Sequence, residues 1–135
     1  MAFFEWDQDK YTVYVAEMDE QHQKLVAIIN RFYEASQEAP NKRKNEVLFD
    51  ELINYTKYHF STEEQLFDSK GYPASESHKA MHRNLVHSVV EVRKKFYLGN
   101  GSINQELLDF LKLWLTSHIL SSDRQYGQYL LKLAA

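Results

Sequence analysis

Four stretches of the chain repeat their apolar residues at intervals of three and four positions, with polar residues between them. This spacing places the apolar positions on one face of an amphipathic α-helix. The stripes are Met18, His22, Leu25, Ile29 and Phe32; Leu48, Leu52, Tyr55, His59, Glu63 and Leu66; His78, His82, Leu85, Val89, Val92 and Phe96; and Leu107, Leu111, Trp114 and His118. The pattern predicts four helices that share one core.

Turn residues separate the four stretches. Asn41 is expected to cap the second helix, and Gly71, with a proline two residues later, is expected to end it. The segment 99–101, Gly-Asn-Gly, ends the third helix, and the segment 102–105, Ser-Ile-Asn-Gln, has the form of a capping box that opens the fourth. The connections are short, so neighbouring helices should be antiparallel.

These features predict an all-α fold, an up-down-up-down four-helix bundle. Residues 1–135 are expected to form a single domain, of a size common for one domain. An aromatic arm at residues 1–16, with Phe4 and Trp6 as anchors, should lie over a bundle at residues 17–133. A short helical segment should close the C-terminal end.

Polar residues interrupt the predicted apolar faces at corresponding levels. His22 lies near the start of the first helix, and His59 lies near the end of the second. His78 lies at the start of the third helix, and His118 at the end of the fourth. In an up-down-up-down bundle these four positions are at the same end. The topology therefore brings side chains that are distant in sequence into one layer of the core.

Local spacing adds three more side chains to this layer. Glu63 follows His59 by four residues, and His82 follows His78 by four, so each helix presents two polar groups on one face. Asp123 follows His118 by five residues, a step that a straight α-helix would turn by about 140°. If both groups face one site, the helix must distort or end between them, and we predict a break or a π-like turn around residues 119–122.

A single His/His or His/Glu pair is weak evidence, because such pairs occur on solvated faces and lone histidines are often hydrogen-bonded core residues. The evidence here is cumulative. Glu63 lies within an apolar stripe, and an unpaired buried carboxylate costs several kcal/mol. No lysine or arginine lies at the same level of the other stripes to neutralise it, whereas a metal cation would. His87 lies off the stripe and is expected to face water without a metal role.

Imidazole and carboxylate ligands without sulfur suit iron, zinc or manganese. The chain has no cysteine, which excludes disulfides, thiolate-ligated metals and CxxCH haem attachment. Seven side chains are too many for one ion. Two ions bridged by both carboxylates and by an oxygen would fill about eleven of twelve octahedral positions, so one position stays open. Three histidines would then bind one ion and two the other.

The remaining composition narrows the class of protein. A formal net charge of -3 gives no support for binding to nucleic acid or to anionic membranes. No apolar run approaches a membrane span, and the first residues lack the features of a signal peptide. We therefore expect a cytoplasmic protein.

The set of residues resembles the hemerythrin family, and specifically the bacterial hemerythrins, over essentially the whole chain. The likeness includes Trp6, Asp19-Glu20-Gln21-His22, His59-Phe60 with Glu63-Glu64, Gly71-Tyr72-Pro73, His78 with His82, Trp114-Leu115 before His118-Ile119, and Asp123 followed by Tyr126. The resemblance implies a non-haem di-iron site with an oxo or hydroxo bridge. It assigns His78, His82 and His118 to one iron, His22 and His59 to the other, and Glu63 and Asp123 as bridges.

The resemblance also implies reversible dioxygen binding, as an oxygen carrier or store, at the iron held by His22 and His59. The expected pocket lining is apolar: Leu25, Phe60, Trp114, Leu115 and Ile119. No general acid converges on that pocket, so we expect binding and not catalysis. Tyr126 either packs or hydrogen-bonds near the bridging Asp123, or it packs the C-terminal segment.

Three other functions compete with oxygen carriage. A ferritin-like di-iron oxidase or peroxide-handling enzyme would use Glu-x-x-His, and no glutamate lies three residues before any histidine. A zinc hydrolase of the HExxH type would need a glutamate where Lys79 stands between His78 and His82. A module that senses O2 or redox state and signals to a partner protein stays open, and the sequence does not identify such a partner.

Overall fold

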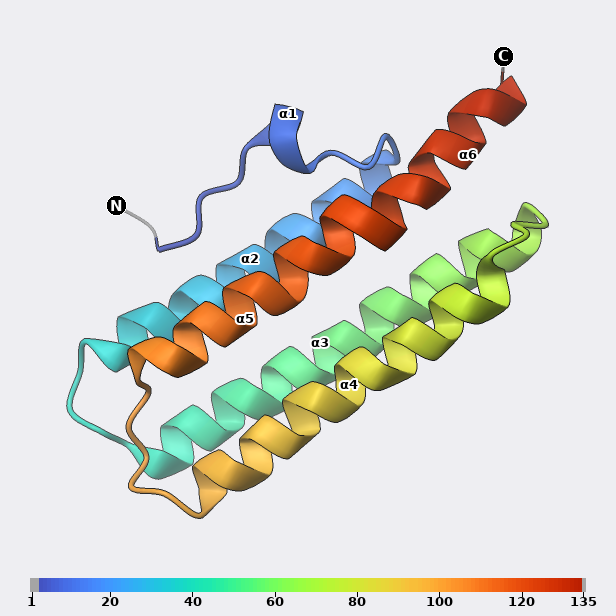
Figure 1. Ribbon diagram of the computed structural model, residues 1–135. Coiled ribbons are helices and arrows are strands. Elements are labelled where there is room, and N and C mark those ends of the chain that lie inside the picture. Colours follow the sequence, from blue (N-terminus) through green and yellow to red (C-terminus); the bar gives the residue numbers. More distant parts are fainter. Residues whose placement is uncertain (1–2, 135) are drawn as a thin grey trace.

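The computed structural model describes residues 3–134, which form helices and no strands. The elements are α1 (Gln8–Tyr11), α2 (Ala16–Ser36), α3 (Lys42–Ser69), α4 (Ser75–Tyr97), α5 (Gln105–His118), the π-helical turn η1 (Ile119–Asp123) and α6 (Arg124–Ala134). Helices α2 to α5 run alternately up and down, with α2 beside α5 and α3 beside α4 (Figure 1). The predicted all-α four-helix bundle is confirmed. No helix within the described range is long and apolar enough to cross a membrane.

The helix ends show which turn signals were interpreted correctly. The Asn41 side chain caps α3 by accepting a hydrogen bond from the Lys44 backbone. Gly71 has a φ of +62°, and the next residue donates its backbone N–H to the Phe67 carbonyl, which is a Schellman-type end. The predicted capping box at Ser102 is wrong. Helix α5 begins at Gln105 with Asn104 as its cap, because Ile103 is buried and the chain stays extended through Asn104.

The predicted stripes form the core. Their fully buried apolar members are Met18, Leu25, Ile29, Phe32, Leu52 and Leu111. At the end of the bundle away from the polar layer, the Phe49 ring lies 4.9 Å from that of Phe32 and 5.0 Å from that of Phe96. Several stripe positions at the helix edges are only partly buried: Tyr55, Leu66, Leu85, Val92 and Leu107. The end of the bundle away from the polar layer is therefore closed by packed aromatic rings.

From residue 3 onward the N-terminal arm lies along α2 and α6 (Figure 1). Phe4 is buried, and its backbone N–H and carbonyl bind the side-chain amide of Asn30, as expected of an anchor. Trp6 is only half-buried, against Tyr11. The arm also contains the short helix α1, which was not predicted. The last part of the arm is held by Asp19 of α2. This buried carboxylate accepts hydrogen bonds from the Val13 backbone and from the Thr12 hydroxyl.

The arm also approaches α6 closely at Gly127. A Cβ atom at that position would lie 1.6 Å from the Val13 carbonyl oxygen, so only glycine allows the contact. We expect Gly127→Ala to displace the arm and to lower the free energy of unfolding by about 1–3 kcal/mol, as overpacking does. Gly99→Ala is the control, because its Cβ would make only an ordinary 3.5 Å contact with the backbone. Equal urea stabilities of the two variants would contradict the expectation.

Candidate metal centre

Seven polar side chains meet at one end of the bundle. Helix α2 contributes His22, α3 contributes His59 and Glu63, and α4 contributes His78 and His82; helix α5 contributes His118 and η1 contributes Asp123. Each of the seven is at most 3% exposed. The convergence that the up-down topology predicted is thus observed. His87 is exposed, also as predicted.

The turn η1 brings Asp123 to the same face as His118. Its five residues, Ile119–Asp123, adopt the π-helical geometry predicted from the five-residue step. Helices α5 and α6 continue on either side of it as one rod (Figure 1). As a result the Asp123 Oδ1 atom lies 3.0 Å from His118 Nε2. The wider turn offsets the rotation that an α-helix would have imposed.

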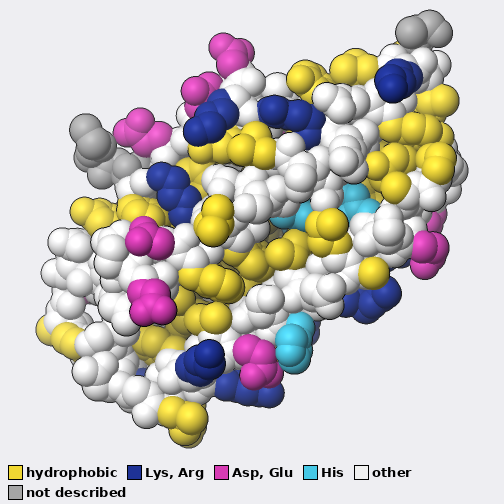
Figure 2. All heavy atoms as spheres, in the orientation of Figure 1, with side chains coloured by type: hydrophobic (Ala, Val, Ile, Leu, Met, Phe, Trp, Pro, Cys, Tyr) yellow, Lys and Arg dark blue, Asp and Glu magenta, His cyan; other side chains and the backbone are white. Residues whose placement is uncertain are grey.

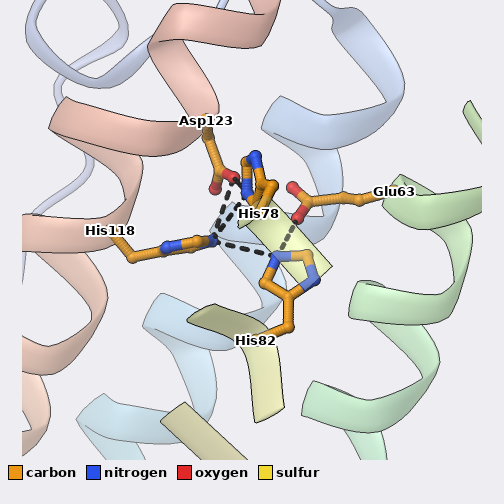
Figure 3. Close-up of side chains that lie close together, drawn as sticks. All are labelled: Glu63, His78, His82, His118 and Asp123. Carbon is orange, nitrogen blue, oxygen red and sulfur yellow. Dashed lines mark hydrogen bonds and ion pairs between the residues drawn. The ribbon is translucent and has the colours of Figure 1, made fainter. Parts of the chain in front are cut away.

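Three histidines surround one oxygen of each carboxylate. His78 Nε2 lies 2.9 Å from Asp123 Oδ1, and His82 Nε2 lies 3.1 Å from Glu63 Oε1. His118 Nε2 completes this group at 3.1 Å from His82 Nε2. Figure 3 shows the five side chains pointing toward a common centre from four different elements. Their ligand atoms all lie within 4.8 Å of one another.

Two histidines face the other oxygen of each carboxylate. His22 Nε2 lies 2.9 Å from Asp123 Oδ2 and 3.3 Å from Glu63 Oε2, and His59 Nε2 lies 3.1 Å from the same Glu63 oxygen. These four residues also have ligand atoms within 4.8 Å of one another. The site therefore has two halves, one with three histidines and one with two. Each carboxylate presents one oxygen to each half.

The chemistry of these donors fits cations. Several buried atoms at the centre of the cluster make no hydrogen bond with any described residue: His22 Nε2, His59 Nε2, both Glu63 carboxylate oxygens and Asp123 Oδ2. Each of them lies within 3.3 Å of a nitrogen or oxygen atom of another residue of the cluster. Leaving so many buried polar atoms unsatisfied is costly unless something else binds them. The His/Glu/Asp cluster is a metal site by this criterion.

In the metal-free protein, protons on the histidines partly neutralise the two buried carboxylates. Burial lowers the pKa of His22, but the adjacent carboxylates of Asp123 and Glu63 outweigh it and raise that pKa to about 10. Burial and repulsion from the Asp123 carboxylate raise the pKa of Glu63, but the neighbouring histidines outweigh both and hold that pKa well below its usual value. Burial also raises the pKa of Asp123, but the histidines around it, His118 foremost, outweigh burial and hold that pKa well below its usual value. Both carboxylates are thus ionised, and His22 is protonated at neutral pH.

Two residues that the resemblance quotes, but to which the sequence analysis gave no role, support the histidines. Gln21 Oε1 lies 2.6 Å from His59 Nδ1, and Glu64 Oε2 lies 2.9 Å from His82 Nδ1. Each partner is adjacent in sequence to a member of the cluster, which is the one signal that could have drawn attention to them. Their contacts depend on how neighbouring helices are rotated, and hydrophobic periodicity does not define that rotation at the level of single atoms.

The residues expected to line a ligand pocket are all buried: Leu25, Phe60, Trp114, Leu115 and Ile119. The Phe60 ring stacks on His82, with ring centroids 3.8 Å apart and planes within 2°. The Trp114 indole donates a hydrogen bond to the Leu85 carbonyl and ties α5 to α4. An apolar ring of α3 thus packs directly against one histidine of the cluster, and a hydrogen bond joins the two helices that carry His82 and His118.

A shallow groove of about 260 Å³ along α4 and α5 reaches His118 from the surface. Most of its lining is apolar, with Met81, Leu85, Leu113 and Trp114 among its residues. Apolar side chains also gather along the seam between these helices in Figure 2. Water that enters from this side therefore meets few hydrogen-bonding groups before His118.

Tyr126 is fully buried next to Phe67 and Tyr72, with ring centroids 4.6 and 5.0 Å away. Its hydroxyl makes no hydrogen bond to any residue in the described part of the chain, so of the roles considered for Tyr126 the structure shows packing. Burial raises the pKa of the Tyr126 phenol, which is therefore neutral at pH 7.

We expect Tyr126→Phe to leave the free energy of unfolding unchanged or to raise it by up to about 1 kcal/mol, because it removes an unsatisfied buried hydroxyl. Tyr129→Phe is the matched control, because the Tyr129 hydroxyl does reach the carbonyls of Lys70 and Gly71. Urea denaturation of the metal-free proteins provides the comparison. A loss above about 1 kcal/mol in Tyr126→Phe would instead show that its hydroxyl is hydrogen-bonded.

Comparison with known proteins gives a consistent result. The family model described as "Hemerythrin HHE cation binding domain" matches residues 13–130. The Bacteriohemerythrin of Methylococcus capsulatus is 32% identical over 127 residues, which cover 94% of this chain and 96% of that protein. That of Pseudomonas aeruginosa is 35% identical over 126 residues, covering 93% and 80%. A solved structure described as "Crystal structure of hemerythrin:wild-type" superposes with a TM-score of 0.84 at 31% identity, covering 94% of this chain and 97% of that one.

Proposed function

The chain belongs to the hemerythrin family, and on that premise we propose that it binds dioxygen reversibly at a non-haem di-iron centre. The observation that carries the proposal is the division of the cluster. One oxygen of each carboxylate contacts members of the group of three histidines, and the other oxygen contacts members of the group of two. A single ion could not use all seven side chains, whereas two ions could share the carboxylates.

In this proposal His78, His82 and His118 hold one iron, and His22 and His59 hold the other. Glu63 and Asp123 bridge them together with an oxo or hydroxo group. The iron pair, when bound, supplies the two electrons that reversible dioxygen binding requires. The two-histidine position has fewer protein ligands, so the exchangeable coordination position belongs there.

The protein supplies a dry and rigid environment for that position. Leu25 and Ile119 are fully buried, and Leu115 is nearly so. Apolar side chains of this kind exclude water and offer no proton to a bound ligand, which favours binding over further reaction. We therefore propose that Leu25, Phe60, Trp114, Leu115 and Ile119 form the dioxygen pocket, and that residues 1–135 act as one hemerythrin-like domain that binds but does not transform its ligand.

The test is anaerobic reconstitution with ferrous iron, followed by exposure to air. We expect a visible charge-transfer band that disappears when oxygen is removed and returns when it is restored. Irreversible oxidation on first exposure would contradict reversible binding and would favour an oxidase. The same protein loaded with zinc is the control, because zinc has no redox chemistry and should give no band.

A further inference from the structure

Two of the five clustered histidines are held by side chains of a neighbouring helix, and the two partners differ in charge. On the two-histidine side, His59 of α3 contacts the neutral amide of Gln21 on α2. On the three-histidine side, His82 of α4 contacts the carboxylate of Glu64 on α3. The two positions therefore differ in the environment of their histidines as well as in the number of them.

Both contacts fix which ring nitrogen carries the proton. A carboxylate oxygen and an amide oxygen can only accept, so Nδ1 of His59 and of His82 must donate. When the ring is neutral, Nε2 is the nitrogen that keeps its lone pair for a metal, and in each ring it lies 3.1 Å from an oxygen of Glu63. The rings are thus oriented as metal ligands from outside the cluster. An anionic acceptor also increases the donor strength of its imidazole, and a neutral amide does so less.

The position of Glu64 suits this action on His82. Its side chain is 31% exposed, whereas that of His82 is 2% exposed. Lys57 and Arg83 line the same crevice, yet the charged partner within 4.0 Å of Glu64 among the described residues is His82 alone. The stacked Phe60 ring keeps the imidazole in the plane that the contact needs. The negative charge of Glu64 is thus directed at one ring.

We propose that Glu64 is a positioning residue that makes the three-histidine position the preferred site of the higher iron oxidation state. Through His82 it stabilises Fe(III) there relative to Fe(II), while Gln21 orients His59 without adding charge. This inference rests on the proposed function. It gives the two metal positions unequal roles: the three-histidine position is biased to hold positive charge, and the two-histidine position is left for the ligand.

Glu64→Gln tests the charge alone, because glutamine keeps an acceptor oxygen for His82. We expect a shift of about tenfold in the Fe(II) to Fe(III) ratio at fixed potential, equal to about 59 mV toward a higher reduction potential for one electron. Glu64→Ala, which also removes the acceptor, should shift the potential at least as far. Glu106→Gln is the control for lost surface charge, since Glu106 is exposed at the start of α5. Spectroelectrochemical titration of the iron-loaded proteins measures all three.

Zinc affinity gives a second readout that does not need iron chemistry. Outer partners of metal-bound histidines typically contribute about 10–100-fold to affinity. We expect Glu64→Gln to weaken zinc binding about tenfold in chelator competition, and Glu106→Gln to leave it unchanged. The inference is overturned if Glu64→Gln matches the control in both potential and zinc affinity, or if only Glu64→Ala shifts the potential. Reversible dioxygen binding that persists in all variants would leave the proposed function intact, so the two failures are distinguishable.

Discussion

Asp123→Asn is expected to leave the protein unable to hold two metal ions. The Asp123 carboxylate reaches His78 and His118 with one oxygen and His22 with the other, so it belongs to both halves of the site. An amide has one oxygen acceptor and no charge, and it cannot bridge two cations as a carboxylate does. We expect metal content to fall from about two ions per chain to one or fewer. The loss of metal affinity should exceed the about 10–100-fold that is typical when a residue supporting a metal ligand is removed.

Two further variants separate this effect from a general loss of structure. Glu63→Gln removes the other shared carboxylate and should have a similar effect, because Glu63 also faces both groups of histidines. His87→Gln removes an exposed histidine of α4 that is outside the cluster and should bind metal as the unmodified chain does. Metal analysis after gel filtration measures the content, and far-UV circular dichroism confirms that each variant is folded. Two ions per chain in Asp123→Asn would rule out its bridging role.

Metal binding is expected to become tighter as the pH rises from 6 to 9. The pKa of His22 is about 10 without metal, so a proton must leave this ring before it can bind a cation. The pKa of His82 is also raised, because Glu63 and Glu64 outweigh the lowering by burial. Each proton displaced makes the affinity rise about tenfold per pH unit. Chelator competition with zinc at several pH values, with proton release followed in weak buffer, provides the measurement; affinity independent of pH would show that no protonated ligand is displaced.

The folding stability of the metal-free protein should fall as the pH rises, whereas metal affinity increases. A raised pKa in the folded state stabilises the fold fully below the unfolded value of 6.5, and this stabilisation is lost as the pH rises toward 10. The lowered pKa values of Glu63 and Asp123 contribute stability that is lost only in acid, as the pH falls through them. The difference in melting temperature between zinc-loaded and metal-free protein should therefore widen from pH 7 to pH 9. A narrowing difference would contradict the protonation assigned to His22.

The polar layer could be predicted from the sequence because its physical causes are local and periodic. Histidines at helical spacing fall on an inward face, short connections impose antiparallel neighbours, and the step from His118 to Asp123 is incompatible with a straight α-helix. The helix α1 and the start of α5 could not be predicted, because Tyr11 and Ile103, which lie at these two places, are buried in the tertiary structure and local spacing does not show this. The contacts of Gly127 with Val13 and of Glu64 with His82 depend on helix rotation and approach, which no local pattern encodes.

The central claim is that this one layer of the core holds two metal ions that share two carboxylates. A crystal structure of the iron-reconstituted chain, with anomalous data collected at the iron edge, tests it most directly. We predict two anomalous peaks, one beside His78, His82 and His118 and one beside His22 and His59, with both carboxylates between them, and about two irons per chain in bulk analysis. A single peak, or one zinc per chain from expression in a medium that supplies both metals, would contradict it.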